Sequence, residues 1–393
     1  MRLTRLQLED FRSYPHAELH PDPGLTIVAG ANGAGKTNLL EAISVAITGR
    51  SHRAGTDAEM VRHGSSFARV RLDLADIDGR ETARVELVLP AEDASPEIRK
   101  RLTLNGLARR PATIGETVRT VLFRPEEMLL LVGSPTDRRR FLDAILAQRD
   151  RAAGRDLAEL GRVLAQRNAL LRAIRREETT ADSLAFWDEQ LALLGARVTA
   201  ARIALVADLA SAIPALHDAV APAEEVGEQV RLTYADTLKD AWPERLSGVG
   251  SAAPDLDELT AAYRRRIAAV REKELWNGAS LVGPHRDDLR VELGGREVAT
   301  HASRGQQRTI ILALKLAETD LLAADGAPTP TVLLDDVFSE LDADRSERLL
   351  ALLLERGQVL VTMADPASLP GGRRGVAVWQ VGDGRLFQAP QVA

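Results

Sequence analysis

The segment Gly30-Ala31-Asn32-Gly33-Ala34-Gly35-Lys36-Thr37 constrains this chain more than any other, because it matches the phosphate-binding loop G-x-x-x-x-G-K-[ST]. Glycines let backbone N–H groups surround phosphate oxygens, Lys36 supplies a positive charge, and Thr37 can offer its hydroxyl to Mg²⁺. An apolar strand from Leu25 to Val28 precedes the loop, and Asn38 to Ile47 reads as a helix whose N-terminus favours phosphate. We therefore predict a nucleotide site here rather than a glycine-rich turn.

A second segment, Thr331 to Asp336, reads as an apolar strand that ends in two carboxylates. In an open parallel sheet, ligands bind at the carboxyl ends of the strands. We expect Asp335 to hold Mg²⁺ through water and Asp336 to orient the water that attacks the γ-phosphate. A solvated strand end is the alternative for such a pair, and the phosphate loop favours the metal site.

Bulk composition sets broad limits. A chain of 393 residues with 45% hydrophobic and 27% charged residues predicts a folded protein of two lobes. No run approaches a membrane span and no export signal is recognisable, so we expect a cytoplasmic location. The lack of cysteine excludes disulfides and thiolate metal sites, and seven scattered histidines predict no zinc cluster. A net charge of −6 means that any nucleic-acid binding depends on local basic surface.

Alternating apolar residues predict a sheet-rich first lobe. The strand and turn signals are Leu6 and Leu8; Val70, Leu72 and Leu74; the Asp78-Gly79 turn; Val85, Leu87 and Leu89; Leu102 and Leu104 before Asn105-Gly106; and Val121 to Phe123. Strand signals return late in the chain at Leu289 to Leu293, Val332 to Leu334 and Val359 to Val361.

From about Asp137 the apolar spacing becomes helical. One helix carries Leu157, Leu160, Leu164, Leu171 and Ile174 at heptad positions interrupted by Arg167, and a second carries Trp187, Leu191, Leu194, Val198, Ala201 and Leu205. The polar segment Glu177 to Ser183 has the length of a hairpin connection. A third helix is expected from Leu259 to Val270, after a loose stretch from Pro243 to Pro254. We predict an antiparallel helical arm with helices of roughly 25 residues, about 40 Å long.

The phosphate loop and the carboxylate strand must meet at one nucleotide, so the two ends of the chain must fold together. We therefore predict an α/β fold, with a mixed sheet that carries the phosphate loop and an inserted helical arm. Its parts are 1–136, the N-terminal part of the head; 137–278, the arm; and 279–393, the C-terminal part of the head.

Ser303-Arg304-Gly305-Gln306 lies directly before the apolar helical run Ile310 to Leu322. Ser303 as N-cap and Gln306 three residues later form a capping box, which is a sufficient structural explanation. The alternative is that this helix start binds a phosphate that its own phosphate loop does not supply. The nucleotide would then bridge two protomers.

Several motifs in order resemble those of the ABC-type ATPase head, and most closely the SMC-like heads of the RecF family, over essentially the whole chain. Besides the phosphate loop they are Leu6 to Tyr14, Phe123 to Glu126, Gly133 to Pro135, Arg138 to Asp143, Gly283 to Asp288, Ser303-x-Gly305-Gln306, and Leu333 to Asp336 with Ser339 to Asp342.

The resemblance implies a bacterial recombination mediator in DNA repair and replication that binds DNA in an ATP-dependent way, dimerises around two nucleotides and hydrolyses ATP slowly. Its partners in the family are RecR and RecO, which help to load RecA on gapped DNA, and its cofactors are ATP and Mg²⁺. The implied nucleotide-binding residues are Gly30, Ala31, Asn32, Gly33, Ala34, Gly35, Lys36, Thr37 and Asn38, with Ser303, Arg304, Gly305, Gln306 and Asp342 facing the opposite protomer. Thr37 and Asp335 would hold the metal, and Lys36 and Asp336 would be catalytic.

Departures from the ABC pattern predict slow hydrolysis. Many ABC heads carry Glu where Asp336 stands and a His after the next strand, where this chain has Val361-Thr362-Met363-Ala364. Phe123 to Glu127 lies where other ABC heads carry a loop with a Gln. It contains no Gln, so we assign it no metal contact. For His285, Arg286 and Asp287, a structured turn is favoured over a polar network behind the site.

Basic groups that could meet DNA phosphates are Arg99-Lys100-Arg101, Arg109-Arg110, Arg138-Arg139-Arg140, Arg172 with Arg175-Arg176, and Arg264-Arg265-Arg266. Aromatic residues make up only 4% of the chain, which favours backbone contact with a duplex or a single/double-strand junction, without sequence specificity, over base stacking. The alternatives are the ATPase subunit of a membrane transporter, disfavoured by the arm and the missing His, and a structural ATPase that binds no DNA.

Overall fold

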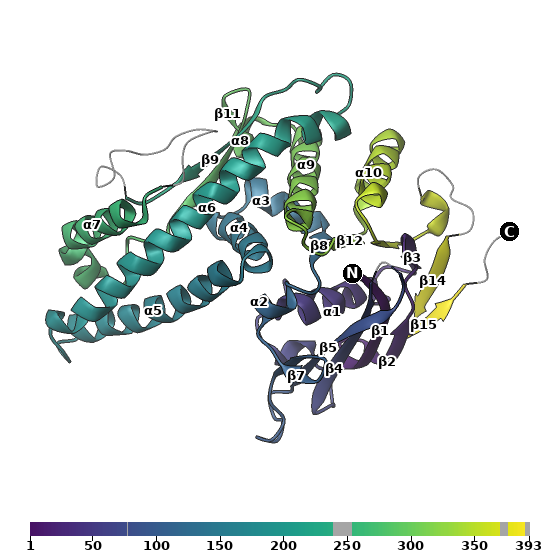
Figure 1. The fold of residues 1–393 in the computed structure, drawn as a ribbon, viewed down its shortest axis with the longest axis horizontal. Helices are drawn as coiled ribbons and strands as arrows, with labels where there is room; N and C mark the ends of the chain where they lie inside the picture. Colours follow the sequence, from purple (N-terminus) through teal and green to yellow (C-terminus); the bar gives the residue numbers. More distant parts are fainter. Residues whose placement is uncertain (77, 239–253, 370–375, 390–393) are drawn as a thin grey trace. The chain divides into compact units, whose positions relative to one another are not determined.

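A computed structural model describes residues 1–76, 78–238, 254–369 and 376–389 (Figure 1). The chain divides into two compact units. Unit 1 comprises Met1–Glu127, Ala219–Pro222 and Lys315–Ala393, and unit 2 comprises Met128–Asp218 and Ala223–Leu314. Of the predicted loose stretch, residues 243–253 lie outside the described part of the chain.

The first sheet of unit 1 is antiparallel, in the order β2-β1-β4-β5-β6-β7. Its strands are β1 (Arg2–Phe11), β2 (Tyr14–Leu19), β4 (Phe67–Ala75), β5 (Glu81–Pro90), β6 (Arg101–Leu104) and β7 (Leu107–Ala108), with the short helices η1 (Ala58–Met60) and α2 (Pro111–Ile114) beside them in sequence. The buried residues alternate from Phe67 to Leu72 in β4 and from Val85 to Pro90 in β5, because one face of the sheet is covered there. The strands predicted from this alternation are confirmed.

The second sheet of unit 1 has the order β15-β14-β3-β13-β12-β8. Its strands are β3 (Leu25–Ala29), β8 (Thr120–Phe123), β12 (Thr331–Asp335), β13 (Val359–Met363), β14 (Ala377–Gly382) and β15 (Arg385–Gln388). All neighbours pair in parallel except β14 and β15. Because β3 and β12 both pair with β13, the phosphate loop after β3 and the carboxylates at the end of β12 lie at the same edge of the sheet.

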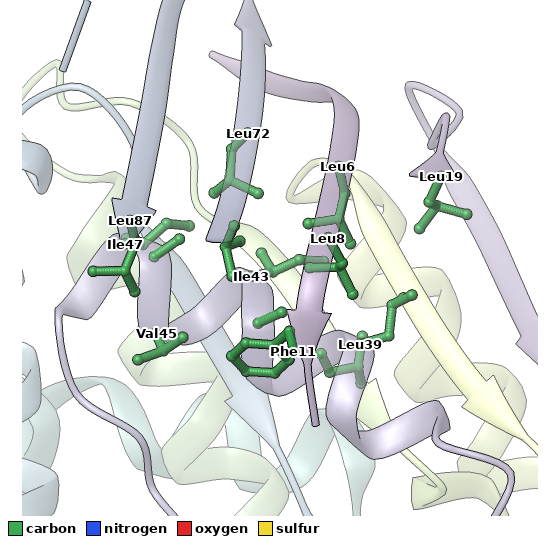
Figure 2. Packing of buried hydrophobic residues seen from close by; sticks show 14 of the residues in the cluster. Leu6, Leu8, Phe11, Leu19, Leu39, Ile43, Val45, Ile47, Leu72 and Leu87 are labelled. Atoms are coloured by element: carbon green, nitrogen blue, oxygen red, sulfur yellow. The ribbon is translucent and has the colours of Figure 1, made fainter. Parts of the chain in front are cut away.

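Helix α1 (Lys36–Thr48) packs between these two sheets. Leu39 and Ile43 of α1 share a core with Leu6 and Leu8 of β1 (Figure 2). Leu333 of β12 belongs to the same core. The remaining helices of unit 1 are η2 (Pro125–Met128), η5 (Val337–Glu340), α10 (Ala343–Glu355) and η6 (Pro366–Ser368). A helix that is apolar on several faces is stable only where it is buried, so α1 is held between the sheets and fixes the phosphate loop at its N-terminus.

Unit 2 is largely helical, with a small sheet of order β11-β10-β9. Its elements are α3 (Leu129–Val132), α4 (Pro135–Arg149), α5 (Arg151–Arg175), η3 (Ala181–Leu184), α6 (Ala185–Val220), β9 (Val230–Ala235), α7 (Leu256–Asn277), β10 (Asp288–Leu293), β11 (Arg296–Glu297), α8 (Val298–His301) and α9 (Arg304–Ala323), the last of which continues into unit 1. Helices α5, α6 and α7 contribute to one core, with Leu160, Leu194 and Tyr263 among its members.

The helical arm is confirmed in outline, with differences in length. Helix α5 has 25 residues, as predicted, whereas α6 has 36. The apolar pattern of α6 continues past Leu205, since Leu209 and Ile213 are also buried. Strand β9, which pairs with β10, was not predicted.

Arg167, predicted as an interruption of the heptad pattern, is fully buried in unit 2. Its guanidinium donates to Asp188 of α6 at 2.9 Å, to Glu274 of α7 at 2.6 Å and to the Ser280 hydroxyl at 2.7 Å. Glu274 is also fully buried, and its second oxygen accepts from the Leu281 N–H at 2.8 Å. Arg167 therefore interrupts the apolar pattern because it forms an ion-pair network that joins α5, α6 and α7.

The segment Ala181–Val220 is long and apolar enough, by length and composition alone, to cross a membrane. This contradicts the prediction that no run approaches a membrane span. Leu191, Leu194 and Val198 in this segment are nevertheless buried in the core of unit 2, which accounts for part of its apolar character.

The compact units differ from the predicted division at 136/137 and 278/279. Residues 279–314, predicted as part of the head, belong to unit 2. The pairing of β10 with β9 and the hydrogen bond from Gln306 to Glu228 explain this assignment, because both tie the segment to residues of unit 2.

Candidate nucleotide site

The phosphate loop runs from the end of β3 into α1. Gly33 and Gly35 have positive φ values of 81° and 112°, which favour glycine. At Gly35 a Cβ would lie 2.7 Å from the Ser13 hydroxyl, and at Gly30 it would lie 2.6 Å from the Val381 carbonyl oxygen, so both positions exclude a side chain. Backbone of this kind at the start of a helix is the arrangement in which N–H groups bind phosphate.

Lys36 lies inside this loop and is buried. Its Nζ donates to the carbonyl oxygens of Gly30 and Ala31, at 2.7 and 3.0 Å. An ammonium has three N–H donors, so one is left for a phosphate oxygen. Asn32 and Ala34 lie on the same loop, and Ala34 N–H donates to the Ala31 carbonyl at 3.1 Å.

Thr37 and Asp335, which are 298 residues apart in sequence, meet at the edge of the parallel sheet. The Thr37 hydroxyl donates to Asp335 Oδ1 at 3.0 Å, and the Thr362 hydroxyl of β13 donates to the same oxygen at 2.7 Å. Asp335 is 6% exposed. A hydroxyl and a carboxylate are the hard oxygen ligands that Mg²⁺ prefers, so this pair fits the predicted metal site.

Asp336 has a left-handed backbone with φ of 52°. Its N–H donates to the hydroxyl and the carbonyl of Thr362, at 3.1 and 3.2 Å. The left-handed residue turns the chain out of β12, and its side chain is only partly buried. The adjacent carboxylates of Asp335 and Asp336 therefore lie in different environments.

Residues of the N-terminal motif Leu6 to Tyr14, and Ser13 within it, contact the phosphate loop and α1. The Tyr14 hydroxyl donates to the Gly35 carbonyl at 3.0 Å, and burial raises the pKa of Tyr14. The Asn38 amide donates to the Ser13 hydroxyl at 3.1 Å, and Arg12 pairs with the buried Glu41 of α1 at 2.8 Å. Sequence reasoning assigned no role to Tyr14 or Thr362. Thr362 lies opposite Asp335 only through the strand register, which no local pattern reveals.

Ser303 and Gln306 form the predicted capping box at the start of α9. The Ser303 N–H donates to Gln306 Oε1 at 2.9 Å, and the Gln306 N–H donates to the Ser303 hydroxyl at 3.1 Å. Ser303 and Arg304 are exposed, and Gly305 is partly buried. These residues belong to unit 2, whereas Asp342 belongs to unit 1, where it caps α10 by accepting from the Arg345 N–H at 2.9 Å. The Asp342 side chain is 58% exposed.

Gly283 to Asp288 form a network within unit 2. Asp287 is fully buried and accepts from the Tyr234 hydroxyl at 2.7 Å and from the Thr237 N–H at 2.8 Å, while burial raises the pKa of Asp287 to about 6. The His285 ring lies 3.1 Å from the Ser280 carbonyl oxygen. These contacts give the motif a structural role in joining β9 and β10 to the helices.

Several of the predicted DNA-binding basic groups have partners inside their own unit. Arg138 pairs with Asp288 at 2.7 Å, and Arg139 donates to the Asp287 carbonyl at 2.8 Å. These two side chains are therefore not free to contact DNA phosphates. Further pairs are Lys100 with Asp57 at 2.8 Å, Arg176 with Glu178 at 2.9 Å and Arg264 with Glu189 at 2.6 Å. Arg140 is 78% exposed.

A phosphate loop before a buried helix, an aspartate at the end of a parallel strand of the same sheet and a capped Ser-x-Gly-Gln helix start define an ABC-type ATPase head. The family model described as RecF/RecN/SMC N terminal domain matches residues 2–385. The chain is 41% identical over 384 residues to the DNA replication and repair protein RecF of Kineococcus radiotolerans, covering 95% of this chain and 96% of that protein. It is also 41% identical over 392 residues to RecF of Frankia alni, covering 97% and 99%. The chain therefore belongs to the RecF family.

Solved structures agree with this assignment. The recombination mediator protein RecF with ATPrS, in the RecFOR pathway, has a TM-score of 0.86 and 27% identity, covering 99% of this chain and 98% of that one. An Smc head bound to the C-winged helix domain of ScpA has a TM-score of 0.53 and 15% identity, covering 99% and 97%. The second likeness concerns the fold alone and supports the predicted α/β head with its helical region.

Proposed function

We propose that this chain is an ATP-dependent, DNA-binding recombination mediator that acts in DNA repair and replication. The observation that carries the proposal is the hydrogen bond between Thr37 of the phosphate loop and Asp335 at the end of β12. It brings a phosphate site and a metal ligand together within unit 1, as ATP with Mg²⁺ requires. Membership of the RecF family favours this function over a transporter subunit.

We assign ATP binding to Gly30 through Asn38. Thr37 and Asp335 would hold Mg²⁺, which neutralises charge on the β- and γ-phosphates, and Lys36 would contact those phosphates. Structures of RecF with ATP and with ATPrS support the choice of nucleotide.

Hydrolysis is proposed to be slow. Asp336 has a shorter side chain than Glu, so it reaches less far toward an attacking water. Met363 and Ala364 stand where many ABC heads carry a His that assists this step. General-base assistance contributes about 10²–10⁴-fold to a reaction, so weak assistance favours a long-lived ATP state.

We propose that ATP joins two copies of the chain. The exposed start of α9, with Ser303, Arg304, Gly305 and Gln306, would meet the γ-phosphate held by the partner copy, and Asp342 would face that copy. Support comes from the exposure of Ser303 and Asp342 and from the ability of a helix N-terminus to bind anions.

The dimer would bind the backbone of duplex or gapped DNA without sequence specificity, through exposed basic residues such as Arg140. RecO and RecR are the expected partners in loading RecA, and the expected location is the cytoplasm, in association with the nucleoid. The pathway named for the solved RecF structure supports a role beside these two partners.

Gel-shift titration on gapped DNA tests the function, with and without ATP. Wild type should bind more tightly with ATP, whereas Lys36→Ala should bind equally weakly in both conditions. Asp93→Ala, an exposed change in the same unit, should behave as wild type. Binding should also weaken with salt, as phosphate neutralisation requires. Equal wild-type affinity with and without ATP would contradict nucleotide gating, and the absence of salt dependence would favour a structural ATPase.

A further inference from the structure

His217, in the last turn of α6, is fully buried. Neither of its ring nitrogens has a hydrogen-bond partner within the described part of the chain. A carboxylate oxygen of Asp218 lies 3.7 Å from Nδ1, beyond hydrogen-bond distance, and that oxygen already accepts from the Gly227 N–H at 2.9 Å. A buried imidazole normally satisfies both nitrogens, so this ring is set up for a ligand that the protein atoms do not supply.

Two carboxylates approach this ring from the turn that follows α6. One ligand atom each of His217, Glu225 and Glu228 lies within 4.8 Å of the others. Glu228 Oε2 is buried and also has no hydrogen-bond partner among the described residues. Glu225 and Glu228 are held next to each other by the hydrogen bond from the Glu228 N–H to the Glu225 carbonyl, at 3.1 Å. The cluster therefore contains a buried imidazole and a buried carboxylate oxygen that have no hydrogen-bond partner among the described residues.

We propose that His217, Glu225 and Glu228 bind a divalent first-row transition ion, with Zn²⁺ as the preferred ion. A neutral imidazole and two carboxylates offset the charge of a divalent cation. The ring nitrogen disfavours Mg²⁺ and Ca²⁺, which select oxygen ligands, and suits Zn²⁺. Donors on one zinc lie about 2.0–2.2 Å from the ion, so small side-chain rotations would close the set. Three protein ligands leave the fourth position to water.

Hydrogen bonds from α9 hold the two carboxylates in position. Glu228 Oε1 accepts from the Gln306 amide at 2.8 Å, and Glu225 Oε2 accepts from the Thr309 hydroxyl at 2.8 Å. Both donors lie in the first turns of α9. Such outer hydrogen bonds orient metal ligands. The ion would therefore tie the end of α6 to the start of α9. This site does not depend on the ATPase function proposed above.

The test is Zn²⁺ binding by the full-length, metal-stripped chain in competition with a chromophoric chelator. We expect one tight Zn²⁺ per wild-type chain and a thermal midpoint that rises on Zn²⁺ addition. His217→Leu and Glu228→Gln should each weaken binding by about tenfold or more, as changes near metal sites commonly do. Glu228→Gln keeps the side-chain oxygen that accepts from Gln306, and Glu228 lies in a partly exposed turn, so this variant keeps the test valid if His217→Leu fails to fold.

His63→Asn, which changes an exposed histidine, should bind Zn²⁺ as wild type does. Absence of stoichiometric Zn²⁺ in wild type would overturn the proposal. Equal affinity in wild type and Glu228→Gln would also overturn it, as would displacement of Zn²⁺ by millimolar Mg²⁺.

Discussion

Asp335 is the residue on which the nucleotide site depends most directly, because it accepts from both Thr37 and Thr362. Asp335→Ala should lower Mg²⁺-dependent ATP turnover by about 100-fold or more, since a catalytic metal contributes several kcal/mol. Steady-state phosphate release measures the change, and nucleotide binding in EDTA shows whether the loop itself is intact. Asp93→Ala is the matched control. Unchanged turnover in Asp335→Ala would mean that the metal ligand lies elsewhere.

His52 gives the protein a pH dependence that can be assigned to one side chain. Burial lowers the pKa of His52 to about 4 from 6.5, and the nearby Arg124 acts in the same direction. The unfolded chain therefore binds more protons between these values. The stability due to neutral His52 is fully present above pH 6.5 and is lost as the pH falls toward 4. The loss is at most on the order of 3 kcal/mol.

Replacing the ring removes this titration. His52→Phe should show a smaller fall in unfolding free energy between pH 6.5 and 4 than wild type, measured by urea denaturation across this range. His63→Asn, at an exposed position, should keep the wild-type slope. Identical slopes for His52→Phe and wild type would refute the assignment.

At the scale of elements, the Arg167 network decides how α5, α6 and α7 pack. Arg167→Leu would restore the apolar heptad but leave Glu274 buried without its cation, at a cost of about 3–5 kcal/mol. Arg167→Leu combined with Glu274→Leu should recover most of this loss, because no unpaired charge then remains. Arg162→Leu, at a 65% exposed position of the same helix, should change stability by less than about 0.5 kcal/mol.

Chemical denaturation of these variants measures the network directly. If the double variant is no more stable than Arg167→Leu alone, the buried Glu274 charge is not the cause of the loss. If Arg167→Leu matches wild type, the network contributes nothing to stability.

Helices, strands and turns could be predicted from the sequence wherever a single local pattern determines them. Alternation predicts β4 and β5 because one face is buried, and the loop pattern predicts the turn into α1 because only glycine fits there. Contacts between distant segments were not predictable. Arg167 was identified as an exception without its partners, and nothing in the spacing of histidines indicates that His217 meets Glu225 and Glu228.

For the whole molecule, the order of strands in the sheets could not be predicted from the sequence. The parallel sheet joins β3, β8 and β12, which long segments separate in sequence, with β13 and β14. Its register brings Asp335 opposite Thr362. The predicted meeting of loop and carboxylate followed from the chemistry of one nucleotide, not from any strand pattern. The grouping of residues 279–314 with unit 2 depends on pairing with β9, a strand that alternation alone did not reveal.

We propose above that two copies of this chain share ATP between the phosphate loop of one and the Ser303 turn of the other. Size-exclusion chromatography with light scattering, with and without a slowly hydrolysed ATP analogue, tests it most directly. Wild type should be a monomer alone and a dimer with the analogue. Ser303→Arg should bind the analogue but stay a monomer, and Ser95→Arg, at an exposed position, should dimerise. A nucleotide-saturated wild type that remains a monomer, or a Ser303→Arg variant that dimerises like wild type, would contradict the claim.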